Sequence, residues 1–215
     1  MAFKHPIKYI APLNSGFTIA EMMVVLGIFA VVSGIILFNY RSFRTNTTVN
    51  TVSQEIALTV RKAQSYALGL QASGVLASLP VKGYGVSFES TRPDQITFFA
   101  ELSPADNQYT TTANLCGTPG LGEECIEYYK IDTGDKIEEL IINSDVIKLT
   151  DPLSSVDVIF KKPSGDVIFC VHSTVYPLCS STTSTPVSTF DIVLVSQDGV
   201  RKSVHIFGNG QISTD

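Results

Sequence analysis

Residues 16–38 read GFTIAEMMVVLGIFAVVSGIILF and decide how the rest of the chain is organised. After Glu21, the only polar side chain up to Phe38 is that of Ser33. The 22 residues that begin at Phe17 would form a helix roughly 33 Å long, which is enough to cross the apolar core of a bilayer. Glu21 lies in the first turn of this helix. Because a carboxylate is costly in lipid, Glu21 is a candidate functional residue.

A short basic leader precedes the apolar segment. Residues 1–16 contain two lysines, one histidine and no acidic residue. A secretory signal peptide has its small-residue cleavage site after the apolar run, whereas here the small residue, Gly16, comes before it. Cleavage after Gly16 would therefore remove the leader, keep the apolar helix and make Phe17 the first residue of the mature chain.

This layout resembles the class III signal of type IV pilins and type II secretion pseudopilins. Five residues ahead of the apolar run carry the resemblance: Gly16, Phe17, Thr18, Ile19 and Glu21. Members of these families usually have a large aliphatic residue where this chain has Ala20. The resemblance implies that prepilin peptidase cleaves between Gly16 and Phe17 at the cytoplasmic face and then N-methylates the new amine of Phe17. Glycine suits such a site because the lack of Cβ lets the backbone approach a catalytic surface.

The same resemblance implies a role for Glu21 in assembly, as the partner of the Phe17 ammonium of a neighbouring subunit. In a low dielectric such a partner offsets the cost of an unpaired carboxylate and sets the axial position of the helix. An alternative from the residue alone is that Glu21 stabilises a helix N-terminus through the dipole, a contribution of ~0.3–1 kcal/mol. The further partners implied are other pilin or pseudopilin subunits, the inner-membrane assembly platform and membrane lipid.

Three parts are expected: a cleaved leader at residues 1–16, a transmembrane or filament-core helix at 17–39, and an exported head domain at 40–215. Two lysines precede the span and two arginines follow it closely, so the positive-inside rule is nearly balanced. Orientation therefore rests on the resemblance. It implies a single-pass inner-membrane protein with its N-terminus in the cytoplasm and its head in the periplasm or outside the cell.

The chain is acidic, which argues against nucleic acid as a general partner. Its formal net charge is −5, and loss of the leader, which carries two lysines and no acid, would change this charge to −7. Such a charge opposes broad electrostatic binding to DNA or RNA. A DNA-binding alternative would depend on a local patch such as Arg201 and Lys202.

The helical pattern continues beyond the span. Apolar residues recur every three or four positions on one stripe, which predicts an amphipathic helix packed on the sheet that follows. A nearly continuous helix is expected from about Phe17 to about Ser73, with residues 40–73 in the head, ended by Gly74. The stripe comprises Val49, Val52, Ile56, Val60, Ala63, Ala67 and Leu70.

From Tyr84 onward the pattern is that of short strands joined by turns, so the head should carry an antiparallel sheet over residues 84–212. Pro163-Ser164-Gly165 and Asp198-Gly199 are hairpin turns, and Gly208-Asn209-Gly210 closes the last strand. The fold class is therefore α+β, with one long helix on antiparallel sheet, which matches the pilin fold. Strands are expected at 84–88, 95–100, 127–131, 136–142, 156–160, 166–170, 190–196 and 200–207.

The last hairpins carry a second resemblance. Residues 160–169 and 192–212 are similar to the C-terminal hairpins of minor pseudopilins of the H class. The function that follows is a structural subunit, a minor pilin or pseudopilin, of a type IV pilus or a type II secretion pseudopilus. The alternative is a DNA-uptake pseudopilin or a DNA-binding minor pilin.

Four cysteines form two pairs with the same spacing: Cys116 and Cys125, and Cys170 and Cys179. Four cysteines allow three connectivities, of which we favour the two local bridges. A zinc site is the alternative, but it needs the closer spacing of a C-x₂₋₄-C motif. Bridges would indicate an oxidising compartment.

No catalytic or cofactor motif stands out, so the chain is not expected to be an enzyme. His172 and His205 fit strand patterns better than the role of a general base. Asp132 and Asp135 could hold calcium, but a polar turn explains them better because a defined calcium site needs more ligands. No cofactor, metal or catalytic residue is therefore expected.

Overall fold

The structure is a computed structural model that describes residues 16–69, 80–102, 107–109, 116, 124–143, 145–148, 155–172, 178–179 and 187–215. Contacts within the chain divide it into two units, with the boundary between Phe43 and Arg44. Each unit is described by itself below.

One helix, α1, covers Ile19–Ala67 and contains the boundary between the units. It ends earlier than the sequence predicts. Gly69 has a φ of 77°, and its N–H donates to the carbonyl of Tyr66 at 3.0 Å, so Gly69 and not Gly74 terminates the helix. Glycine adopts this left-handed conformation without the steric cost of a Cβ atom, which explains why the helix stops here.

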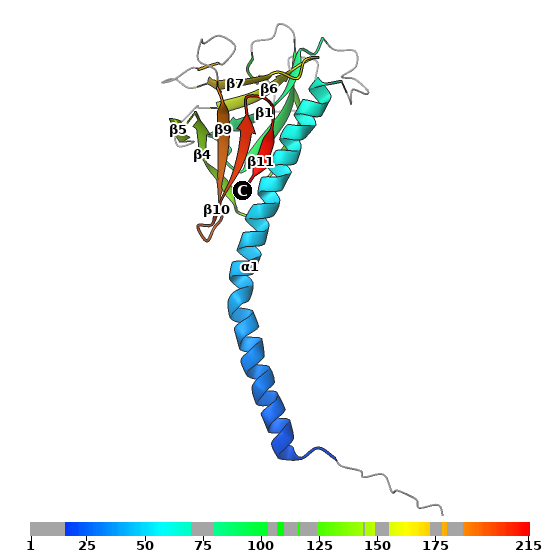
Figure 1. Cartoon of the computed structure of the whole chain (residues 1–215), viewed down its shortest axis with the longest axis vertical. Coiled ribbons are helices and arrows are strands. Elements are labelled where there is room, and N and C mark those ends of the chain that lie inside the picture. The colour runs from blue at the N-terminus through cyan, green and yellow to red at the C-terminus, as the bar shows by residue number, and fades with distance from the viewer. Residues whose placement is uncertain are drawn as a thin grey trace, which may run out of the picture. The chain divides into compact units, whose positions relative to one another are not determined.

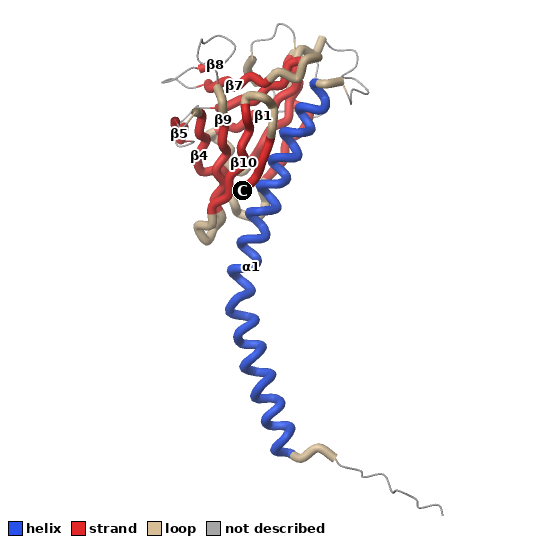
Figure 2. The backbone as a smooth tube through the Cα atoms, viewed as in Figure 1, coloured by secondary structure: helices blue, strands red, loops and turns tan. Residues whose placement is uncertain are grey.

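The described strands of the second unit form two sheets, and both are antiparallel, as the short connections predicted (Figures 1 and 2). The first has the order β3-β2-β1-β6-β7-β8 and the second the order β11-β10-β9-β4-β5. The strand bounds are β1 Gly83–Glu89, β2 Gln95–Glu101, β3 Cys125–Lys130, β4 Lys136–Ile142, β5 Asp145–Lys148, β6 Ser155–Lys161, β7 Val167–His172, β8 Leu178–Cys179, β9 Thr189–Val195, β10 Arg201–Phe207 and β11 Ile212–Thr214.

Two or three consecutive strands belong to one sheet before the chain crosses to the other sheet. Within each such group, consecutive strands pair as hairpins. The turns at residues 163–165 and 198–199 join β6 to β7 and β9 to β10, as predicted. Gly208-Asn209-Gly210 ends β10, as predicted, but β10 is not the last strand. This turn leads into β11, which pairs with β10 through Ile206 opposite Ile212. The short strands β5, β8 and β11 were not predicted.

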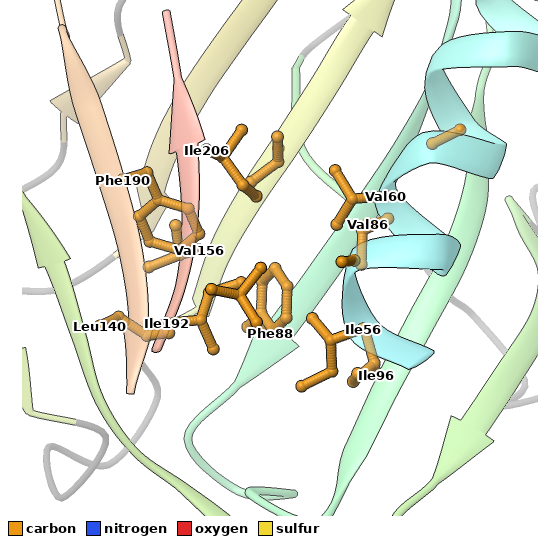
Figure 3. Packing of buried hydrophobic residues seen from close by; sticks show 14 of the residues in the cluster. Ile56, Val60, Val86, Phe88, Ile96, Leu140, Val156, Phe190, Ile192 and Ile206 are labelled. Carbon is orange, nitrogen blue, oxygen red and sulfur yellow. The ribbon is translucent and has the colours of Figure 1, made fainter. Parts of the chain in front are cut away.

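A single core lies between α1 and the inner faces of both sheets. Six of the seven residues of the predicted stripe are buried, from Val49 to Ala67, and Leu70 lies outside the described residues. Figure 3 shows Ile56 and Val60 of α1 beside Val86 and Ile96 of the first sheet, with Phe190 of the second sheet across the core. Every second residue of each central strand points into this core, which is the alternation that the sequence pattern predicts.

The outer face of the first sheet carries a smaller apolar cluster of Phe99, Ile159, Ile168 and Cys170. Asp157 lies on this face, is fully buried, and accepts a hydrogen bond from the Tyr109 N–H at 2.9 Å. His172 Nε2 lies 3.1 Å from the same carboxylate. The hydrogen bond from Tyr109 to the buried Asp157 thus holds residue 109 against the first sheet.

Candidate functional site

The apolar segment at the start of α1 exposes almost all of its side chains. Among the described residues, one helical stretch, Ile19–Phe38, is long and apolar enough to cross a membrane. Its large apolar side chains are exposed, Phe29 and Leu37 among them, and the chain itself buries none of them. A surface of this size and composition requires lipid or other protein to cover it.

The peptide bond that the sequence marks for cleavage lies outside the helix. Gly16, Phe17 and Thr18 have no regular secondary structure, and α1 begins at Ile19. The Phe17 side chain is 87% exposed. Apart from its chain neighbours, no residue in the described part of the chain lies within 4 Å of the position that a Cβ would take on Gly16. The chain therefore leaves the backbone at Gly16–Phe17 open to an enzyme.

Thr18 and Glu21 close the start of α1 with reciprocal hydrogen bonds. The Glu21 N–H donates to Thr18 Oγ1 at 3.2 Å, and the Thr18 N–H donates to Glu21 Oε2 at 2.9 Å. Thr18 Oγ1 also donates to Glu21 Oε2 at 3.0 Å. This is a capping box, in which two backbone donors that a helix leaves unsatisfied find side-chain partners.

The capping box bears on both interpretations of Glu21. It gives the residue a helix-terminal role more specific than the dipole alone, and it explains why α1 starts at Ile19. The box also uses only one carboxylate oxygen, Oε2, so Oε1 remains available for another partner, which could be charged. The box was not predicted from the sequence, although the spacing T-x-x-E ahead of an apolar run is its known signature.

The four cysteines lie in the two local pairs, Cys116–Cys125 and Cys170–Cys179. The first bridge ties residue 116 to the start of β3, and the second joins neighbouring positions of β7 and β8. Cys125 and Cys170 are fully buried. Each bridge therefore fixes one end of a loop to the sheet.

We expect each bridge to contribute ~2–3 kcal/mol to the free energy of unfolding, because it closes a short loop in the unfolded chain. Replacing Cys170 and Cys179 together by alanine should lower the unfolding free energy by this amount, and alanine avoids burying a hydroxyl at position 170. Denaturant unfolding of the full chain in detergent measures the change. Non-reducing peptide mapping of protein from its native compartment checks the pairing: free thiols would contradict the bridges, and a crossed pairing would contradict the local assignment.

The candidate metal ligands Asp132 and Asp135 have the contacts of an ordinary turn in the part of the chain that the structure describes. No group of three His, Cys, Asp or Glu side chains there could hold a metal ion. Asp135 is buried and accepts a hydrogen bond from Thr133 Oγ1 at 2.6 Å, while Asp132 lies 3.7 Å from Lys130. These contacts are those of a polar turn.

Arg201 and Lys202 do not make one basic patch, because consecutive residues of a strand point to opposite faces of the sheet. Arg201 Nη2 lies 2.9 Å from Glu138 Oε2, so its charge is locally compensated. Arg201 and Lys202 therefore do not supply the local patch for which they were given as an example.

Comparison with known proteins identifies the N-terminal segment. Residues 12–37 match the family model of the prokaryotic N-terminal methylation motif. No curated protein and no solved structure matches the chain. The match includes Gly16, Phe17 and Glu21, and the apolar helix fits a single-pass membrane-anchored protein. Through residues 12–37, this chain carries the signal of the type IV pilin-like prepilins.

Proposed function

We propose that this chain is a minor pilin or pseudopilin. Prepilin peptidase cleaves it between Gly16 and Phe17 and N-methylates Phe17, and the mature subunit then assembles into a type IV pilus or a type II secretion pseudopilus. The observation that carries the proposal is the position of the methylation motif: its cleavage bond lies just ahead of α1, and its apolar part is a helix that the chain leaves uncovered.

Three parts of the chain have separate roles in this proposal. Residues 1–16 are the leader that the peptidase removes, residues 17–39 anchor the precursor and later pack in the filament core, and residues 40–215 form the exported head. The buried core of the head uses residues from Val49 onward. The head therefore needs no contact from the anchor segment in order to bury its own core.

Assembly follows from the exposed apolar surface. In the membrane, lipid covers the side chains of Ile19–Phe38. When the helix leaves the membrane, the same side chains need the helices of other subunits to cover them. At Gly27 and Gly34, nothing in the described residues outside the adjacent backbone of α1 lies within 4 Å of the position that a Cβ would take, so both leave room for a neighbouring helix to approach closely.

The test uses native protein from cells that contain an active prepilin peptidase. We expect an intact mass that lacks residues 1–16 and includes one added methyl group. A photo-crosslinker at Ile28, which is exposed in the apolar segment, should capture other subunits that carry the same type of signal, and their identity assigns the machine. A crosslinker at Tyr128 of the head is the matched control. An uncut chain that captures only lipid would contradict the proposal.

A further inference from the structure

His205 lies between two carboxylates on the outer face of the second sheet. Its Nδ1 atom is 2.8 Å from Asp191 Oδ1, and its Nε2 atom is 3.6 Å from Asp215 Oδ2. Asp191 is directly opposite His205 on β9, and Asp215 follows β11, whose Ser213 is opposite His205 on the other side. One imidazole thus contacts acidic groups from both strands that flank β10.

The two contacts require different protonation states of the imidazole. At 2.8 Å the Nδ1–Asp191 contact is a full hydrogen bond, which a neutral imidazole can donate when its proton is on Nδ1. The Nε2–Asp215 contact is an ion pair, which requires a second proton on the ring. When that proton leaves, a nitrogen lone pair faces the Asp215 carboxylate, and the attraction is lost.

Other charges on this face do not replace these partners. On β10 itself, Arg201 points to the same face but is paired with Glu138. On β4, Ile141 is opposite Asp191, and the nearest acid in that row is Glu139, which is opposite Val193. Lys202 points to the other face of β10. The charge of His205 is therefore matched by Asp191 and Asp215.

The strand beside Asp215 also connects the second sheet to α1. Arg61 Nη2 donates to the Ile212 carbonyl at 3.3 Å, and Gln64 Nε2 donates to the Gly210 carbonyl at 3.2 Å. The Ser203 N–H donates to Asp215 Oδ1 at 2.9 Å. The strand β11 is an edge strand of three residues, so it pairs with another strand on one side only, with β10.

We propose that His205 is a proton-dependent clamp, which holds β11 to β10 when the imidazole is charged and releases the Asp215 side of the contact when it is neutral. Burial lowers the pKa of His205, but the hydrogen bond and charge of Asp191 and the charge of Asp215 together outweigh it, so the net shift raises the pKa. A raised pKa means that the clamp is complete below about pH 6.5 and is lost as the pH rises through the folded value.

Hydrogen exchange of the full chain in detergent at pH 6 and pH 8, corrected for intrinsic exchange, tests the clamp. We expect the amides of residues 211–215 to lose protection several-fold at pH 8. Asp215→Asn changes a side chain that is 67% exposed and should leave the fold intact, yet it should reduce protection at pH 6 to the pH 8 level. Glu139→Gln, on the same face, is the matched control and should keep the pH dependence.

Two results would overturn the proposal. One is equal protection of residues 211–215 at both pH values in the unchanged chain. The other is a pH dependence that persists in Asp215→Asn and in His205→Gln. His172 lies beside Asp157 in the first sheet, so peptides from residues 208–215 report on the second sheet and not on the surroundings of His172. This experiment does not depend on cleavage or assembly, and its outcome is independent of the proposed function.

Discussion

Gly16→Leu is expected to leave the chain in the membrane with its leader attached. The peptidase must bring the backbone at Gly16–Phe17 close to its catalytic groups, and a branched side chain at position 16 blocks that approach. We expect cleavage to slow by about a hundredfold or more, which corresponds to ~2.7 kcal/mol in the activation barrier. Immunoblotting of a time course, with intact mass of the product, measures the effect.

The structure makes this experiment specific to the enzyme. Among the residues that the structure describes, none other than the chain neighbours of Gly16 lies within 4 Å of a Cβ placed there, so those residues leave room for the first atom of a larger side chain. Gly27 is surrounded by the same open space, and Gly27→Leu is therefore the matched control that should be cleaved at the normal rate. Normal cleavage of Gly16→Leu would show that the peptidase does not use this glycine.

Local patterns predicted the helix and the strands well, because each depends on residues close in sequence. The stripe from Val49 to Ala67 needs only the period of a helix, and β1 and β6 are short runs rich in β-branched and aromatic residues that are bounded by turn residues. The end of α1 was predicted about six residues too late, at Ser73 instead of Ala67, since both Gly69 and Gly74 satisfy the sequence rule for a C-terminal glycine. Which one acts depends on the φ angle that packing selects.

The division into two sheets could not be predicted in the same way. β3 and β4 are separated by only five residues, Ile131 to Asp135, and no local signal indicates that β4 leaves the first sheet to pair with β9. The strand β11 has three residues, too few to show an alternating pattern. The contacts of His205 depend on this register, so the sequence pattern indicated only that His205 belongs to a strand.

In the candidate site, too, some features follow from local sequence and others depend on the fold. Gly16, Phe17 and Glu21 are close together in sequence, and all three lie within the segment that matches the methylation motif. The capping box has an equally local signature at Thr18 and Glu21. The register of β7 with β8, which places Cys170 opposite Cys179, comes from the fold instead.

Glu21→Ala is expected to impair entry into filaments without preventing insertion, cleavage or folding of the head. Insertion depends on the apolar segment, and loss of a charge makes it more favourable. Cleavage depends on the leader and Gly16, which both remain. The head buries its core with residues from Val49 onward, all of them far along the chain from position 21.

Assembly differs from these steps because the helix must find one axial position among similar apolar helices. An ion pair between Glu21 and the Phe17 ammonium of a neighbouring subunit would select that position, and the Oε1 atom of Glu21 is not used by the capping box. Without the carboxylate, the amine is buried unpaired at a cost of about 3–5 kcal/mol. We therefore expect the variant to be at least about tenfold depleted in purified filaments, relative to its amount in the membrane.

Three further variants separate the charge from the helix cap. Glu21→Gln keeps a hydrogen-bond acceptor for the Thr18 N–H but removes the charge, and it should fail in assembly as Glu21→Ala does. Thr18→Val removes the cap and keeps the charge, so it should assemble better than either. Ser33→Ala removes the other polar side chain of the span and is the matched control. If Glu21→Ala and Glu21→Gln enter filaments at normal levels while Thr18→Val does not, Glu21 acts in this protein only through the start of its own helix.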